Sequence, residues 1–515
     1  MSFFNSVYSS DNVANTFSFD LNSRFRNNLT NQLLVTYSIL DTRRGSPSQP
    51  FPFVDIMDGT GTLTPYMALG YELFTWHNGY HNRSITAKDD LTYYFGYHKL
   101  LAGVSYDYQM VDNVYMRNGT GYYRYNSLDD FLNMAAPETV ALTYGYDGAE
   151  APGARVRYHR AAVYAQDEWN PTSKLKLTAG VRLETIIFDN QDVIRNNAIY
   201  NIDYNGYHVD TGTWPTTKLQ ASPRIGFTYD VLGNGDLKLR GGTGLFTGRL
   251  PLVFFTNMPS NSSMYQNVTS ATTRYKDGVV NPETSDLAIL NAFQGKFITD
   301  KDELLNYLHG LDASRYPTTI TPDKGTVGSS FAAVDPKFKM PQMWKTTLAV
   351  DYNLPFSFPF SVTAEGIFNK NVNAVYIQDL NMKPVEGFAR LNGADNRPVF
   401  PSDYMYTKTS AYLLENTSRG YGFIGSFQIN TTPVQGVNLT AAYTHTVSKE
   451  LTGMPGSDAA SAFTYIPSIY GPNNPVLHNS QYVTPDRFVL SATGHDKSGN
   501  HYGLIYETWR GGYNY

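Results

Sequence analysis

The sequence predicts an all-β fold: an antiparallel, up-and-down transmembrane β-barrel with short periplasmic turns and long extracellular loops. Two observations lead to this prediction. Apolar and polar residues alternate along many segments, and short connections alternate with long ones along the chain. A third observation argues against membrane-spanning helices, because no stretch of about 18 consecutive apolar residues occurs.

The alternation is clearest in segment 174–184, and segments 17–25, 102–110 and 224–231 follow the same pattern. Successive side chains of a strand point to opposite faces, so a period of two indicates one apolar and one polar face. In the first of these segments we expect Leu175, Leu177, Val181 and Leu183 to face lipid, and Lys176, Thr178, Arg182 and Glu184 to face the lumen or rim.

About fourteen strands are predicted. They cover residues 16–26, 32–41, 89–97, 100–112, 155–169, 174–189, 219–231, 237–247, 342–353, 360–371, 419–431, 437–448, 486–495 and 500–511. The odd-numbered connections are short and rich in Asn, Gly, Pro and Asp, as hairpin turns are. The even-numbered connections run from about 30 to 90 residues. A soluble β-sandwich or propeller is the alternative, but no blade repeat of about 40–50 residues is visible and long loops on one side only are unusual for a sandwich.

Composition narrows the function further. The chain has 515 residues, a net charge of −5, 14% aromatic residues and only 17% charged residues. The slightly acidic balance, without a basic block, argues against nucleic acid as a partner. The absence of cysteine excludes disulfides, thiolate metal sites and cysteine nucleophiles. The first residues, Met1–Asn5, do not resemble a signal peptide.

Two loop segments are expected to contain short helices. Ser127–Leu132 begins with an N-cap serine, and Thr299–Leu308 begins with a threonine cap followed by apolar residues at helical spacing. We expect these helices to pack the loops above the barrel.

Several motifs resemble a known family. Ala162–Trp169 ends in Gln-Asp-Glu-Trp, and Leu175–Arg182 ends in Gly-Val-Arg. Ala221–Asp230 then leads through a Gly-Asn-Gly-Asp turn into Leu239–Pro251, which contains Arg-Gly-Gly-Thr-Gly-Leu-Phe-Thr-Gly. This run is similar to the barrel of TonB-dependent outer-membrane receptors and transporters, and its glycine-rich part resembles the Oar-like branch of Bacteroidota.

The resemblance implies a barrel of about 22 strands in the outer membrane of a Gram-negative bacterium, filled by an N-terminal plug. Fourteen predicted strands leave about eight unaccounted for. We therefore expect residues 1–515 to form a partial barrel, with the plug domain, the N-terminal domain and the C-terminal strands absent. The TonB complex would act through the missing plug, and the outer-membrane lipids would surround the barrel.

Three motifs invite a chemical interpretation but have simpler ones. Gly241–Gly244 lacks the Gly-Lys-Ser/Thr ending of a phosphate loop, so a bend or close packing against a plug explains it better. Asn234–Asp236 lacks the further acidic ligands of a calcium loop and suits a hairpin turn. His77 and His81 have a metal-capable spacing only on a helix, and the local sequence favours a loop.

The remaining motifs give no catalytic site. Arg240 and Arg249 flank the glycine-rich strand, where charges on the lumen face pair with neighbouring strands or a plug, and contact with a substrate carboxylate is the alternative. No nucleophile elbow or metalloprotease helix motif occurs, so no enzyme activity and no cofactor are predicted.

Aromatic residues in the loops give the only ligand signal. Aromatic rings offer stacking surfaces for sugars and apolar contact for peptides, although packing of the long loops on one another is the better explanation of most of them. The connection of about ninety residues after Gly248 starts with an apolar run that we expect to fold inward over the barrel mouth. The weak candidates for substrate contact are Trp76, Tyr122, Tyr123, Arg249, Phe254, Phe255 and Asn257.

The function predicted from the resemblance is energy-coupled import of a nutrient, an oligosaccharide, a peptide or a metal chelate, driven by the proton-motive force through TonB. The alternative is an outer-membrane adhesin or structural barrel whose long loops bind a partner.

Overall fold

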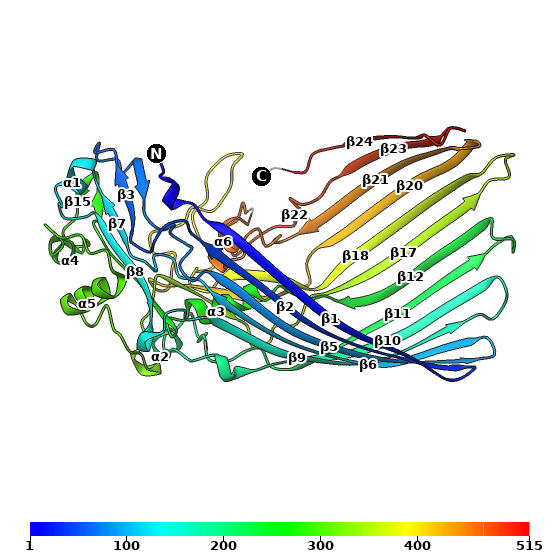
Figure 1. Cartoon of the computed structure of the whole chain (residues 1–515), viewed down its shortest axis with the longest axis horizontal. Helices are drawn as coiled ribbons and strands as arrows, with labels where there is room; N and C mark the ends of the chain where they lie inside the picture. Colours follow the sequence, from blue (N-terminus) through cyan, green and yellow to red (C-terminus); the bar gives the residue numbers. More distant parts are fainter. Residues whose placement is uncertain (467, 514–515) are drawn as a thin grey trace.

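The computed structural model describes residues 1–466 and 468–513, and Figure 1 shows a tall, curved sheet of tilted strands. Fourteen long strands of the described part form this sheet in chain order, each antiparallel to the next. They are β1 (Ser9–Arg26), β2 (Leu29–Gly45), β5 (Gly79–Phe95), β6 (His98–Val114), β9 (Ala154–Trp169), β10 (Leu175–Phe188), β11 (Lys218–Asp230), β12 (Leu237–Thr247), β17 (Gln342–Asn353), β18 (Phe360–Asp379), β20 (Tyr421–Val434), β21 (Val437–Glu450), β23 (Asp486–His495) and β24 (His501–Trp509).

These strands confirm the predicted all-β, up-and-down architecture, but several extend farther at the loop end than predicted. β5 begins at Gly79 and not at residue 89, and β18 continues to Asp379. Around His81 and Arg83, apolar and polar residues do not alternate along β5. This end of the strand lies beyond the apolar band of the outer face, so its outward side chains need not be apolar. Backbone pairing continues there without the sequence pattern that reveals it.

The short connections all lie at one end of the sheet, on the right in Figure 1. Between β11 and β12, Gly233 and Gly235 adopt positive φ angles of 82° and 85°, which glycine tolerates without strain. The Asp230 carboxylate accepts hydrogen bonds from both of their N–H groups, at 2.9 and 2.8 Å. The Asn234–Asp236 motif is therefore part of a hairpin turn, as predicted.

The sheet is open. No pairing joins β1 to β24 within the described residues, so both edge strands have one unpaired side. Glycines help the sheet to curve: a Cβ atom on Gly242 would lie 2.9 Å from the carbonyl oxygen of Ile225 on β11. This close approach between strands explains the glycine-rich segment of β12 without a phosphate ligand.

At the opposite end the loops build a separate layer, which we call the loop cap. Its sheet has the order β4–β3–β7–β8–β13, with β3 and β7 parallel. Its core includes Val54, Tyr123, Leu142, Leu304 and Leu308, all at most 1% exposed. The loop-cap elements are β3 (Phe53–Met57), β4 (Pro65–Leu69), β7 (Tyr122–Tyr125), β8 (Thr139–Gly145), β13 (Gln266–Thr272), α1 (Leu128–Leu132), α4 (Leu287–Asn291) and α5 (Lys301–Leu311).

The two predicted loop helices are present. Ser127 caps α1, accepting a hydrogen bond from the N–H of Asp130. The cap of α5 is Asp300 and not Thr299, because the Asp300 carboxylate accepts from the N–H groups of Asp302 and Glu303. The threonine prediction was therefore wrong by one residue.

Shorter elements complete the loop end of the molecule. They are β14 (Tyr275–Lys276), β15 (Val279–Val280), β16 (Ser330–Val334), β19 (Ser410–Thr417), β22 (His478–Asn479), α2 (Asn197–Tyr200), α3 (Val253–Asn261) and α6 (Ala459–Thr464). β16 runs parallel to β19, which pairs with the loop end of β18. Within the described ranges, no helix is long and apolar enough to cross a membrane.

Candidate ligand-binding site in the lumen and the loop cap

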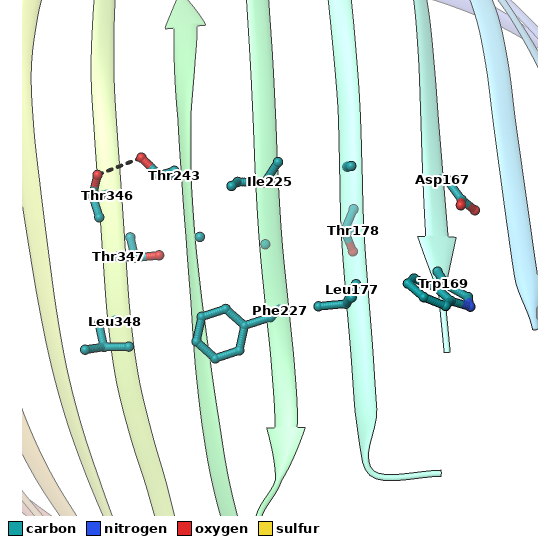
Figure 2. A pocket seen from close by; sticks show the side chains of 13 residues that line it. Asp167, Trp169, Leu177, Thr178, Ile225, Phe227, Thr243, Thr346, Thr347 and Leu348 are labelled. Atoms are coloured by element: carbon teal, nitrogen blue, oxygen red, sulfur yellow. Dashed lines mark hydrogen bonds between the residues drawn. The ribbon is translucent and has the colours of Figure 1, made fainter. Parts of the chain in front are cut away.

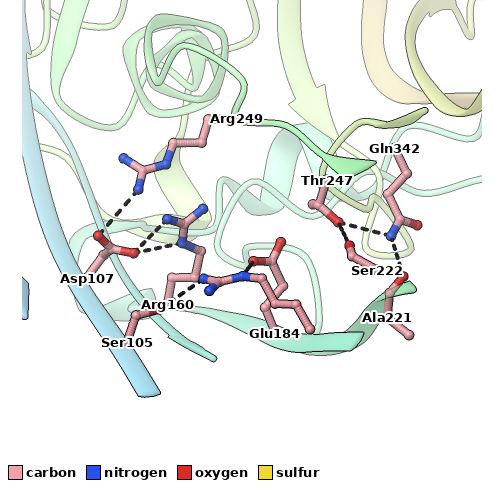
Figure 3. Close-up of polar contacts among 10 residues, drawn as sticks. Ser105, Asp107, Arg160, Glu184, Ala221, Ser222, Thr247, Arg249 and Gln342 are labelled. Carbon is pink, nitrogen blue, oxygen red and sulfur yellow. Dashed lines mark hydrogen bonds and ion pairs between the residues drawn. The ribbon is translucent and has the colours of Figure 1, made fainter. Parts of the chain in front are cut away.

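The concave face of the sheet carries a charged network centred on Asp107 of β6. Its carboxylate accepts hydrogen bonds from Nη2 and Nε of Arg160 at 2.7 and 2.9 Å, and from Nη2 of Arg249 at 3.3 Å. Asp107 is 4% exposed, whereas 55% of the Arg249 side chain is exposed. Figure 3 shows the two arginines reaching Asp107 from different segments, so Arg249 ties the start of the long loop to β6 in the lumen wall.

The same wall carries two further polar contacts, also drawn in Figure 3. Arg182 of β10 donates to Glu184 and to the Ser105 hydroxyl, both at 2.9 Å. Glu184 is 4% exposed, and its Oε1 atom has no hydrogen-bond partner within the described part of the chain. Arg182 and Glu184 thus lie on the lumen side, as the alternation predicted.

Arg240 of β12 pairs with charged residues of neighbouring strands, as predicted from the sequence. Its guanidinium contacts Asp351 of β17 at 2.8 Å and Glu365 of β18 at 3.4 Å. Acidic side chains of the neighbouring strands therefore balance the charge of Arg240, and no bound substrate is needed to explain this arginine.

The long loop after β12 folds inward, as predicted. Its helix α3 packs against the inner sides of β6 and β9 and against β16. Phe255 has no exposed surface and meets the rings of Phe188, Trp214 and Phe338 at centroid distances of 5.1 to 6.2 Å. The barrel mouth is thus partly filled by a helix of this chain.

The structure divides the seven predicted contact residues between the mouth and the loop cap. At the mouth, Arg249 faces the lumen, Phe254 is half-buried beside the core around α3, and Asn257 is 9% exposed. The Asn257 side-chain amide donates to the carbonyl oxygen of Ser457 at 2.8 Å. Asn257 and Phe255 hold α3 in place, and their contact with a ligand stays a prediction.

In the loop cap, Tyr122 and Tyr123 belong to β7. Tyr122 is 5% exposed and donates to Asp55, and Tyr123 has no exposed surface and donates to the carbonyl oxygen of Ile298. Burial raises the pKa of both phenols, so both stay neutral donors. A fully buried side chain reaches a ligand only if its surroundings move.

Trp76 lies elsewhere in the loop cap, in the wall of a cavity of about 390 Å³. The cavity lies between β8 and the first turn of α5, and its polar lining includes Thr143, Glu150 and Lys301. Sequence reasoning missed these three residues because they come from segments far apart in the chain, and no spacing rule connects them.

The two histidines that were weighed as metal ligands do not act together. His77 lies in a turn with φ of 51°, and its pKa is lowered, mainly by burial. His81 lies on β5, and its Nδ1 is 2.8 Å from the Asp41 carboxylate. No group of three or more metal-ligating side chains occurs within residues 1–466 and 468–513.

The outer face carries a different kind of cavity, an apolar groove of about 580 Å³ shown in Figure 2. Leu177 pairs in register with Trp169 on one side and Phe227 on the other, and Ile225 and Leu348 continue the same face. Among the residues drawn there, the hydroxyls of Thr243 and Thr346 satisfy each other at 2.7 Å. The groove therefore offers almost only hydrocarbon, on the side opposite to the lumen.

Comparison with known proteins identifies this architecture. The family model described as "Outer membrane beta barrel domain" matches residues 4–499. The chain belongs to the outer membrane beta barrel domain family. This membership confirms the predicted transmembrane barrel and its place in the outer membrane, and the groove on the outer face then lies against membrane lipid.

Solved structures of outer-membrane proteins are similar to the chain at low sequence identity. The outer membrane transporter YddB from Escherichia coli is 12% identical, with a TM-score of 0.52 over 95% of this chain and 49% of that chain. The copper transporter OprC is 11% identical, with a TM-score of 0.48 over 97% and 52%. A mutant of the Serratia marcescens hemophore receptor HasR is 10% identical, with a TM-score of 0.46 over 98% and 59%.

The barrel thus spans about half the length of the structures it resembles. Its likeness to an outer-membrane transporter is confirmed at the level of the fold. No curated protein matches the sequence.

Proposed function

We propose that this chain is the barrel part of a TonB-dependent outer-membrane receptor that imports a nutrient too large to diffuse through porins. The nutrient would be an oligosaccharide, a peptide or a metal chelate. The observation that carries the proposal is the partly filled mouth, where α3 and its loop lie in the entrance above a charged lumen wall. An open pore for passive diffusion needs a clear channel, whereas a gated receptor needs a closed one that ligand binding opens.

We propose further that strands outside this chain close the barrel between β24 and β1. Membrane barrels leave no exposed strand edge within the hydrocarbon, because unpaired backbone groups there cost several kcal/mol each. About eight additional strands would bring the total to the size of the plugged transporter barrels. A plug domain in the lumen would meet Arg249, whose side chain is the exposed part of the Asp107 network.

Energy would come from the proton-motive force through the TonB complex acting on the plug. We assign the protein to the Oar-like branch of Bacteroidota because of its glycine-rich β12 segment.

A surface adhesin is the second candidate. The loop cap favours it in one respect, since this layer has its own sheet and hydrophobic core and is a rigid platform for a partner.

The experiment that separates the two candidates is uptake in cells. Deleting the gene and, separately, the TonB gene should abolish uptake of one of the three nutrient classes, and reintroducing the gene should restore it. A protonophore added before the nutrient should have the same effect as the TonB deletion. Normal uptake after gene deletion, together with lost attachment to a surface or another cell, would contradict import and support the adhesin.

A further inference from the structure

The cavity beside Trp76 has the size and lining of a small-molecule site. Its volume of about 390 Å³ lies within the range of about 300–1,000 Å³ that ligand pockets usually have. The buried side chains of Met116 and Leu142, both at most 2% exposed, give it an apolar floor. The cavity lies in the loop cap, well away from the short turns at the other end of the sheet.

Trp76 forms a fixed aromatic wall. Its ring meets Tyr71 edge-on at a centroid distance of 5.9 Å and His77 edge-on at 4.5 Å. The indole also packs against the backbone of Gly119, where an added Cβ atom would lie 2.5 Å from Cδ1 of the ring. These contacts hold the ring in one orientation, so it can stack against a ligand with little loss of side-chain entropy.

The polar groups of the cavity include both donors and acceptors. Thr143 is 1% exposed, and its hydroxyl oxygen Oγ1 has no hydrogen-bond partner within the described residues. A buried hydroxyl without a partner is costly, and a ligand hydroxyl would satisfy it once the neighbouring side chains move to expose it. Lys301 contributes an ammonium group that is 2.6 Å from the Asp302 carboxylate, and Glu150 lies exposed at the rim.

We infer that this cavity binds a neutral, polyhydroxylated ring, one residue of a saccharide. A sugar ring presents C–H groups on one face, which suit the Trp76 indole, and hydroxyls at its edge, which both donate and accept. The charges of Lys301 and Asp302 cancel each other, and Glu150 lies exposed at the rim, where water and salt screen its carboxylate. The interior of the cavity therefore offers little attraction to a charged ligand.

This inference rests on the proposed function, since it selects the oligosaccharide among the three nutrient classes. It also assigns a role to the loop cap, which would capture one sugar residue of a longer chain before the chain reaches the mouth. Binding and uptake are nevertheless separate measurements, so the cavity and the import mechanism can fail independently.

The test uses the complete protein, purified from outer membranes in detergent, and an array of immobilised neutral oligosaccharides from plant and microbial polysaccharides. The strongest binder is then titrated in solution by calorimetry. Trp76→Ala should weaken its affinity by about ten-fold or more, and Trp76→Phe should recover part of the loss. Tyr66→Ala is the matched control, because Tyr66 is a 50% exposed aromatic residue of the loop-cap sheet that does not line the cavity.

Thr143→Val tests the buried hydroxyl by two readouts. If Thr143 bonds a sugar hydroxyl, the variant should lose affinity several-fold while the melting temperature of the free protein stays equal or rises. Unchanged affinity in both the Trp76→Ala and Thr143→Val variants would overturn the assignment. So would an array without any binder, or binding of alkylammonium or carboxylate probes at this cavity in place of sugars. Normal sugar binding without sugar uptake would leave the cavity assigned and reject the import proposal.

Discussion

Asp107 is the residue on which the lumen network depends. It is buried and accepts hydrogen bonds from Thr86, Arg160 and Arg249. Asp107→Asn should lower the free energy of unfolding by about 3–5 kcal/mol, because the largely buried Arg160 then loses its counter-charge. Thermal unfolding in detergent measures the change, and a loss below about 1 kcal/mol would contradict the network's structural role.

Arg249 should respond differently although it contacts the same carboxylate. More than half of its side chain is exposed, so solvent screens the ion pair and Arg249→Ala should change stability by about 1 kcal/mol or less. If Arg249 contacts the plug or the ligand, uptake should fall in cells while the amount of folded protein stays constant. Unchanged uptake would remove Arg249 from the import mechanism. The matched comparison is Arg240→Ala, because Arg240 lies on a strand and pairs with a residue of the neighbouring strand.

Glu415 on β19 makes the region between cap and mouth sensitive to pH. Burial, and next the charge of Asp335, raise the pKa of Glu415 from 4.5 to about 7. The folded protein therefore holds this proton more tightly than the unfolded chain does. The resulting stabilisation is complete below about pH 4.5 and is lost as the pH rises through about 7.

Glu415→Gln should consequently stabilise the protein at pH 8, by about 1–2 kcal/mol after allowing for partial exposure to solvent, and change it little at pH 5. Melting curves of the variant and the wild type at both pH values measure the difference. Glu386→Gln, at an exposed position, is the control. The same shift at both pH values would show that Glu415 is not protonated in the folded protein near neutrality.

The sequence predicted the faces of individual strands, whereas the seven contact residues that it offered stay predictions. Alternation alone placed Arg182 and Glu184 on the lumen side. Only one assignment of the two faces turns the apolar side chains of the strand outward, since a shift by one residue would turn all of them inward. Aromatic content alone could not separate Tyr123, which packs the loop cap, from Trp76, which lines a cavity. The difference lies in tertiary contacts such as those with Gly119 and α5.

The strand β10 gives the clearest test of which face of a strand meets lipid. Val181 lies at the middle of this strand, points outward and is 42% exposed, whereas Leu177 lies near the turn end. Val181→Arg should cost about 2–4 kcal/mol, Leu177→Arg less, and the lumen-facing change Thr178→Arg least. Refolding into lipid vesicles with denaturant titration measures the three values. Equal costs would refute the assignment of the two faces.

The loops show where prediction from periodicity ends. No strand was predicted between residues 247 and 342, yet this connection contains β13, which completes the loop-cap sheet by pairing with β8. Short strands that pack against other loops need no regular alternation, so the sequence does not reveal them. Replacing residues 260–281 by a flexible linker would remove β13 and expose the loop-cap core, so this deletion cannot separate ligand capture from folding.

For the whole molecule, the fourteen strands were predictable because each crosses a membrane with one face in lipid and one in the lumen. That constraint acts on every strand independently of its neighbours. The open edges at β1 and β24 and the apolar outer face should make the isolated chain aggregate in water. Sedimentation after expression without membranes tests this, and a monodisperse soluble chain would contradict it.

The orientation of the barrel in the outer membrane is the most direct test of the proposed architecture. The chain has no cysteine, so single cysteines report one position each. Tyr66→Cys lies in the loop cap, and Asn234→Cys lies in the turn between β11 and β12. With a large membrane-impermeant maleimide, Tyr66→Cys should be labelled in intact cells and Asn234→Cys only after the outer membrane is permeabilised. Labelling of Asn234→Cys in intact cells, or of neither position until the cells are lysed, would contradict the barrel in this membrane and this orientation.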